Sequence, residues 1–270
     1  MNTDAKAPRP PAPIVPAATV LLVRDGEAGL EVFMVQRHHQ IDFASGALVF
    51  PGGKVDKADY HAELRAATDG ADGLDDLQLA LRLAAIREAF EESGILLARD
   101  SVGGPLLGAG RLADLEPRWR EPMRKGEVPL IDMVQAEGLR LAADVLVHYA
   151  HWITPPMMPK RFDTHFYLAC APAEQLALHD GHESVESVWI DPNEAVADAL
   201  ARRRTIIFPT RLNLEKLACH ACVDDALTTT RAGRVVTVLP EVRESPDGPT
   251  LCITPDAGYA TISALLKDIG

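Results

Sequence analysis

The segment from Arg87 to Gly94 constrains this chain most, because it places three carboxylates within five residues and ends at a glycine. In a helix, Glu88, Glu91 and Glu92 stand three and four positions apart and share one face. Like charges at that spacing destabilise an isolated helix by roughly a few tenths of a kcal/mol per pair. A divalent cation turns the repulsion into a ligand set, because Mg²⁺ and Mn²⁺ prefer carboxylate oxygen. The segment therefore predicts a metal site on a helix, suited to chemistry on phosphate.

The helix that carries this acidic face is predicted to run from about Leu77 to Ser93. Asp75 or Asp76 is a candidate N-cap, and Gly94 stands where a left-handed residue ends a helix. An apolar stripe at helical spacing predicts the face that packs in the core: Leu79, Leu83, Ile86 and Phe90.

Short apolar runs separated by turn residues predict strands along the rest of the chain. They cover residues 17–23, 31–36, 47–50, 164–170, 187–190, 235–239 and 251–254, and the first two form a hairpin. Further helices are predicted at residues 131–149, 193–202 and 212–222, whereas residues 54–73 read as polar and irregular. Strands mixed with helices in irregular order predict an α/β sandwich with a mixed sheet, not a repeating βαβ fold.

Composition narrows the class of protein. The formal net charge of −12 argues against broad nucleic-acid binding, and no apolar run approaches the ~20 residues of a membrane span. Residues 1–16 are rich in proline and alanine, lack the apolar core of a signal peptide, and are expected to form a flexible tail. The four cysteines include a lone C-x-x-C without a second ligand pair. We therefore expect buried, reduced thiols and a cytoplasmic location.

Two separated segments together resemble a Nudix box, the signature of a family of diphosphate hydrolases. They are Phe50-Pro51-Gly52-Gly53 and the run from Arg87 to Ile95. The second segment matches the family pattern at every fixed position, but about 20 residues are inserted between the two. The glutamate expected after the glycine is replaced, and Asp59 or Asp56 is the candidate substitute.

A box interrupted in this way is similar to that of the acyl-coenzyme A diphosphatase branch of the family. The shared segments are Gln36-Arg37, Val49–Gly53, Ala85–Glu92, Trp152–Pro155 and Arg161–Phe166. The resemblance implies a Nudix-type α/β/α sandwich, Mg²⁺ or Mn²⁺ as cofactor, and coenzyme A or an acyl-CoA as the small-molecule substrate. The implied products are adenosine 3′,5′-bisphosphate and 4′-phosphopantetheine or its acyl form.

The resemblance also implies roles for the residues of the box. Glu88, Glu91 and Glu92 are the expected metal ligands, with the Gly53 carbonyl as a further one. Arg87 is expected to orient the carboxylates through charge-assisted hydrogen bonds, and Glu88 and Glu91 to take part directly in catalysis. The general base is left open among these glutamates and two later acids, Glu183 and Glu186.

Arginines outside the box are candidates for binding the substrate. Arg37 is expected to contact a substrate phosphate, with an exposed strand-end arginine as the alternative. Lys160 and Arg161 are candidates for the 3′-phosphate of coenzyme A. Arg161 and Asp163 either line the site or form an ordinary ion pair worth about 0–1 kcal/mol.

The expected organisation is a flexible tail, a Nudix domain over residues 17–205, and an extension over residues 206–270 that packs on it. The domain carries insertions at about residues 56–75 and 115–150. The segment from Ile131 to Tyr149 is expected to pack in the core, with an acyl-binding groove or a homodimer interface as alternatives. Two rival functions stay open: the same hydrolysis of ADP-ribose, NADH or another nucleoside diphosphate derivative, and a non-catalytic ligand-binding module.

Overall fold

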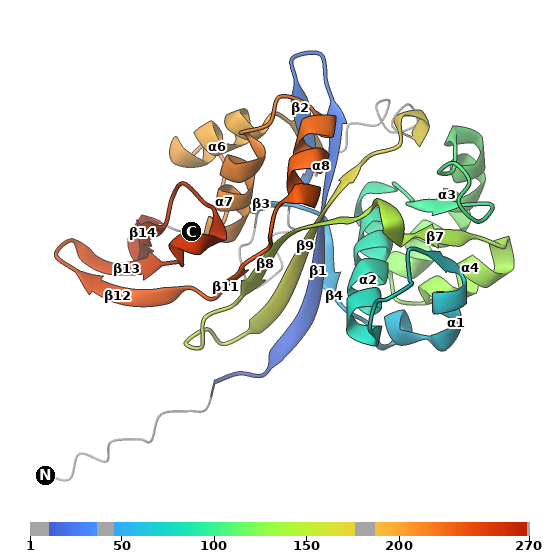
Figure 1. Cartoon of the computed structure of the whole chain (residues 1–270), viewed down its shortest axis with the longest axis horizontal. Helices are drawn as coiled ribbons and strands as arrows, with labels where there is room; N and C mark the ends of the chain where they lie inside the picture. Colours follow the sequence, from blue (N-terminus) through green and yellow to red (C-terminus); the bar gives the residue numbers. More distant parts are fainter. Residues whose placement is uncertain (1–10, 37–45, 176–186, 269–270) are drawn as a thin grey trace, which may run out of the picture.

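The structure, a computed structural model, describes residues 11–36, 46–175 and 187–268, and its centre is an eight-stranded mixed sheet (Figure 1). The strands are β1 (Ile14–Asp25), β2 (Leu30–Gln36), β3 (Leu48–Val49), β4 (Gly52–Lys54), β8 (Val147–Ile153), β9 (Arg161–Cys170), β10 (Ser187–Ile190) and β11 (Thr237–Val238). Their order is β10-β2-β1-β9-β8-β11, with β3 beside β2 and β4 beside β1. β1 pairs in parallel with β9, and β11 pairs in parallel with β8. The other described pairs of this sheet are antiparallel.

Helices cover both faces of this sheet. Helix α2 (Asp76–Ser93) lies on one side, and α7 (Phe208–Leu217) and α8 (Val223–Ala232) lie on the other (Figure 1). Alternate residues of β1 enter two separate cores, as the strand period of two requires: Val20 and Leu22 join the core of α2, whereas Leu21 and Val23 join that of α7. The predicted α/β/α sandwich with a mixed sheet is confirmed.

Smaller elements flank the sandwich. Beside α2 lie η1 (Lys57–Tyr60), α1 (Ala62–Ala66), α3 (Ala109–Arg124), α4 (Leu130–Glu137), η2 (Ala143–Val145) and a three-stranded sheet of β5 (Thr68–Asp69), β7 (Arg140–Ala142) and β6 (Ala98–Arg99). On the other side lie α6 (Pro192–Leu200), η3 (Pro255–Ala257) and a sheet of β12 (Glu241–Ser245), β13 (Gly248–Cys252) and β14 (Ser263–Leu265), followed by η4 (Leu266–Asp268). In the described part of the chain, no helix is both long and apolar enough to cross a bilayer.

Both ends of α2 follow from local sequence signals. Asp75 accepts a hydrogen bond from the Gln78 amide, and the Gln78 side chain accepts one from the Asp75 amide, which forms a capping box. Gly94 ends the helix with φ 77°, a left-handed conformation that favours glycine. The predicted helix at residues 77–93 is confirmed, and its last turn carries the three glutamates.

The long helix predicted at residues 131–149 is wrong. The helix α4 ends at Glu137, because Gly138 takes a left-handed conformation with φ 65°, and β7, η2 and β8 follow. The β-branched and aromatic residues of the run from Val145 to Tyr149 suit a pleated strand better than a helix. The segment enters the sheet beside β9, so it forms neither the predicted helix nor a helical groove.

Residues 54–73, predicted to be irregular, are ordered into β4, η1, α1 and β5. The chain turns at Asp56, whose side chain caps η1, and Leu64 of α1 is fully buried.

At the amino end, β1 begins at Ile14, which pairs with Arg161 of β9, so the expected tail is at least three residues shorter than predicted. At the other end, the helix expected at residues 212–222 spans residues 208–217, and Cys222 occupies the N-cap position of the separate helix α8.

The four cysteines are free thiols, as expected, but none of them is buried. Cys170 and Cys219 are exposed, and Cys222 and Cys252 are half-buried. The expectation of buried thiols is therefore wrong. Cys170 is the last residue of β9, and Cys219 follows the end of α7, so both lie where an element leaves the core.

Candidate active site

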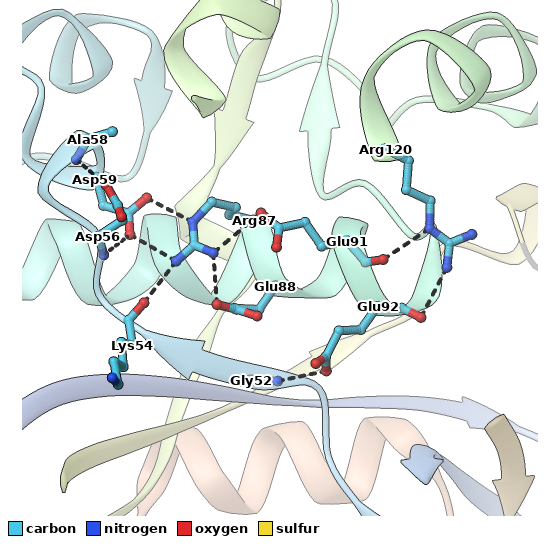
Figure 2. A network of polar contacts seen from close by, with 10 residues as sticks. All are labelled: Gly52, Lys54, Asp56, Ala58, Asp59, Arg87, Glu88, Glu91, Glu92 and Arg120. Atoms are coloured by element: carbon cyan, nitrogen blue, oxygen red, sulfur yellow. Dashed lines mark hydrogen bonds and ion pairs between the residues drawn. The ribbon is translucent and has the colours of Figure 1, made fainter. Parts of the chain in front are cut away.

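The acidic last turn of α2 lies against the two glycines of β4 (Figure 2). The amide of Gly52 donates a hydrogen bond to Oε2 of Glu92 at 3.1 Å. A Cβ atom at Gly53 would overlap the carboxylate of Glu88, and one at Gly52 would overlap Thr19 and the Ala18 carbonyl of β1. Glycine is required at both positions because of these close approaches. The two halves of the box, far apart in sequence, thus meet in the fold.

Arg87 is the centre of the polar network at this site (Figure 2). Its Nε and Nη2 donate to the two carboxylate oxygens of Asp59, each at 3.1 Å. Its Nη1 donates to Oε1 of Glu88 at 2.7 Å and to Oε1 of Glu91 at 3.3 Å, and its Nη2 donates to the Lys54 carbonyl at 2.9 Å. One guanidinium therefore fixes two glutamates of α2 relative to the segment that follows β4.

Asp59 is the acid that replaces the expected glutamate. It lies six positions after Gly53, and its side chain is fully buried. The turn before η1 positions it, because Oδ2 of Asp59 accepts from the Asp56 amide at 2.8 Å while the Asp56 side chain accepts from the Ala58 amide at 2.8 Å. Of the two candidates, Asp59 binds Arg87 and Asp56 caps the turn. The residues inserted between the halves of the box leave this contact intact.

Burial dominates the electrostatics of the carboxylates. It raises the pKa of Glu91 to about 7, against the opposing charge of Arg87, and it raises the pKa of Glu88 in the same way. Burial alone would lower the pKa of Arg87, but the hydrogen bonds and charges of Asp59, with those of the two glutamates, raise it instead. Arg87 therefore stays protonated, and the glutamates bind protons more readily than exposed carboxylates do.

The chemistry of this donor set suits a hard divalent cation, although the three glutamates, as described, do not bring three ligand atoms within 4.8 Å of one another. Glu88, Glu91 and Glu92 offer carboxylate oxygens from one helix face, and burial leaves the charges of Glu88 and Glu91 poorly solvated. Arg87 alone cannot neutralise three glutamates together with Asp59. A cation with oxygen preference compensates the remaining negative charge, which is the chemistry that the sequence predicts for this face.

Arg120 of α3 is a further residue of the site that sequence reasoning missed. Its Nε and Nη2 donate to the main-chain carbonyls of Glu91 and Glu92 at 3.1 and 3.0 Å (Figure 2). Its Nη1 donates to Oε1 of Glu116 at 2.6 Å. A cation at the carboxyl end of a helix satisfies carbonyls that have no helical partner and complements the helix dipole. No sequence signal reveals this contact, because 28 positions separate Arg120 from Glu92.

Other predicted residues lie elsewhere or outside the described part of the chain. Arg37, Glu183 and Glu186 fall outside the described residues. Arg161 is buried at the start of β9, where its Nε donates to the Thr154 carbonyl at 3.0 Å, and its role in substrate binding stays a prediction. Arg161 and Asp163, both described, do not form the alternative ion pair, because Asp163 contacts His151 and His165 instead.

The mixed sheet, the glycine strand and the carboxylate helix together define a protein of the Nudix class. The model of the family described as the NUDT19 Nudix domain matches residues 64–217, more than half of the chain. The chain belongs to this family. The matched segment includes the glutamates of α2 and the strands β8 and β9, and begins after the glycines of β4.

Individual relatives agree with this assignment. The chain is 28% identical over 237 residues to the human acyl-coenzyme A diphosphatase NUDT19, covering 73% of this chain and 63% of that protein. It is 26% identical over 228 residues to the same-named protein of Xenopus laevis, with 70% and 60% covered. The crystal structure of a NUDIX hydrolase from Alicyclobacillus acidocaldarius superposes with a TM-score of 0.64 at 27% identity, covering 83% of this chain and 99% of that one. The chain spans about 60% of the length of the two named diphosphatases.

Replacing Asp59 by Asn tests whether this buried acid holds Arg87. We expect the free energy of unfolding to fall by about 1–3 kcal/mol, because the Arg87 guanidinium loses two hydrogen bonds to its fully buried charged partner while keeping Glu88 and Glu91. The matched control is Asp56→Asn, which retains a side chain able to cap the turn and should cost at most about 1 kcal/mol. Urea denaturation of both variants measures the difference. Equal and small effects would show that the Asp59–Arg87 pair does not hold the site.

The raised pKa of Glu91 predicts a pH dependence of stability in metal-free protein. Between the ordinary value of 4.5 and about 7, folded Glu91 binds more protons than the unfolded chain, so the free energy of unfolding falls as pH rises through this window. The contribution is at most about 3 kcal/mol. Denaturation in the presence of a chelator should show a smaller slope for Glu91→Gln and an unchanged slope for Glu127→Gln, at an exposed position of the surface. Identical slopes for wild type and Glu91→Gln would contradict the burial argument.

Proposed function

We propose that this protein hydrolyses the diphosphate bond of coenzyme A or an acyl-CoA, with Mg²⁺ or Mn²⁺ as cofactor. The products are adenosine 3′,5′-bisphosphate and 4′-phosphopantetheine or its acyl form. The observation that carries the proposal is the meeting of the two halves of the box. Glu92 accepts from the Gly52 amide, Glu88 lies against Gly53, and Arg87 binds both Glu88 and Glu91. The names of the human and Xenopus relatives, both acyl-coenzyme A diphosphatases, support the choice of substrate.

Residues of α2 would both bind the cation and orient the carboxylates that hold it. Glu88, Glu91 and Glu92 would hold the cation, which when bound neutralises charge on the phosphoryl oxygens and lowers the pKa of a bound water. Arg87 keeps the carboxylates of Glu88 and Glu91 in place by donating one hydrogen bond to each. In the hydrolysis, water oxygen bonds to one phosphorus, the bridging P–O bond breaks, and the proton of the water leaves to a base.

The second layer of the site keeps this arrangement rigid. Asp59 holds the far side of the Arg87 guanidinium, and the Lys54 carbonyl accepts its remaining hydrogen bond. Arg120 fixes the main chain of Glu91 and Glu92 from α3. Positioning of this kind lowers the entropic cost of reaching the transition state, because the ligands are already oriented before the substrate binds.

The double substitution of Glu91 and Glu92 by Gln tests the proposed chemistry. Turnover of CoA with Mg²⁺ or Mn²⁺ should fall to background, because the variant removes two anionic ligands while keeping side-chain shape. The matched control is Asp76→Asn, at the exposed start of the same helix, which should retain turnover. Circular dichroism checks that both variants fold.

A substrate panel with product analysis distinguishes the proposal from its rivals. Release of adenosine 3′,5′-bisphosphate from CoA supports the proposed substrate. Faster hydrolysis of ADP-ribose or NADH would replace that substrate while keeping the chemistry. Full activity of the Glu91→Gln, Glu92→Gln variant, or the absence of both metal binding and hydrolysis in the wild type, would overturn the proposed enzyme and favour a binding module.

The cytoplasmic location and a homodimer stay predictions from the sequence. Fractionation of the native cells and measurement of molar mass in solution address them separately from the chemistry.

A further inference from the structure

A second group of possible ligands lies on strands β8 and β9, apart from the glutamates. One ligand atom each from His151, Asp163 and His165 lies within 4.8 Å of the others. Nε2 of His151 contacts Oδ1 of Asp163, and Nε2 of His165 lies 3.8 Å from the same oxygen. His151 and His165 are direct neighbours across the strand pair, and their rings stack with centroids 4.0 Å apart. Both imidazoles therefore turn the same nitrogen toward one carboxylate.

The outer nitrogens of these two imidazoles are held by further side chains. Nδ1 of His151 hydrogen-bonds with Oγ1 of Thr237 at 2.7 Å, and Nδ1 of His165 hydrogen-bonds with Nε2 of His148 at 3.0 Å. Thr237 belongs to β11, which pairs with β8 directly opposite His151. Histidines that bind metal are typically oriented in this way, by a hydrogen bond to the nitrogen that does not face the ion.

Simple hydrogen bonding accounts for only part of this arrangement. A proton between His151 and Asp163 satisfies that pair, but 3.8 Å is too long for a hydrogen bond from His165 to the same oxygen. A metal ion bonds to imidazole nitrogen and carboxylate oxygen at about 2.0–2.2 Å. Two such bonds span ligand separations of up to about 4 Å, so an ion between the three groups satisfies His165 as well as His151.

We propose that His151, His165 and Asp163 bind a divalent transition-metal ion of the Zn²⁺ class. Two imidazoles with one carboxylate favour Zn²⁺ and its neighbours in the series over Mg²⁺, which prefers oxygen ligands. Three protein ligands leave at least one coordination position open. The side chains are 16%, 20% and 32% exposed for His151, His165 and Asp163, so water or an anion has access to that position.

The proposed site is separate from the glutamates but lies on the same face of the sheet. Gly53 is paired with Ala18, Ala18 with His165, and His165 with His151, which places these residues in one row across β4, β1, β9 and β8. With about 4.8 Å between neighbouring strands, His165 lies roughly 10 Å from Gly53 along the row. The site shares no ligand with the carboxylate cluster, so each can be removed without the other.

Titration of the full chain with Co²⁺, a spectroscopic substitute for Zn²⁺, tests the proposal. In the metal-free protein one Co²⁺ should give visible d–d bands typical of four or five ligands, whether or not a further Co²⁺ binds at the glutamates, and Zn²⁺ should remove these bands. His165→Asn and Asp163→Asn should each weaken binding by at least about 100-fold, and Thr237→Val by about 10- to 100-fold. The Glu91→Gln, Glu92→Gln variant should keep the same spectrum, because its ligands belong to the other site.

The matched control is His220→Asn, which changes a histidine paired with Asp225 far along the chain and should leave Co²⁺ binding unchanged. Circular dichroism confirms folding of each variant, and Thr237→Val, which removes no ligand, provides a second test if a ligand variant does not fold. Equal Co²⁺ binding by wild type, His165→Asn and Thr237→Val would overturn the proposal. Loss of the d–d bands only in the glutamate variant would overturn it too, and would leave the proposed diphosphatase unaffected.

Discussion

The contact between Arg87 and Asp59 is the interaction on which the rest of the site depends. It joins the last half of α2 to the segment that follows β4 through two hydrogen bonds of 3.1 Å, and the Asp59 side chain is fully buried. Removing Asp59 would cost the guanidinium two charge-assisted hydrogen bonds and its anchor beyond α2, which makes the contact expensive to lose. The same guanidinium orients Glu88 and Glu91. A change that moves α2 away from Asp59 would therefore also move the carboxylates of these two glutamates.

A bound cation would offset the unfavourable burial of the charged carboxylates of α2. Burial raises the pKa of Glu88 and Glu91, and a single arginine does not compensate for the charge of all the acids around it. An ionised cluster of this kind lowers stability in the absence of a ligand, and strain of this sort is commonly kept at functional sites. Two features stabilise the helix against this repulsion. Its apolar stripe packs on β1, and Arg120 binds the main-chain carbonyls at its end.

The sequence predicts the parts of this structure that depend on local patterns. The helix with its caps, the hairpin of β1 and β2 and the meeting of the glutamates with Gly53 all follow from periodicity, turn residues and one motif. The choice of Asp59 over Asp56 depends on the turn at η1. The sequence of β8 does not identify it as a strand, because its short apolar run is ambiguous between the helical and the strand period. Arg120 and the grouping of His151 and His165 with Asp163 do not follow from the sequence, which marks only Asp163 as a candidate, because tertiary contacts between distant segments create both arrangements.

Anomalous diffraction from crystals grown with Mn²⁺ tests the central claim most directly, because the signal locates the metal independently of any assumption about ligands. The account predicts anomalous density within coordination distance of Glu88, Glu91 and Glu92, with Arg87 still bound to Asp59. Anomalous density absent from the last turn of α2, or a structure in which Arg87 leaves Asp59 when the metal binds, would contradict it.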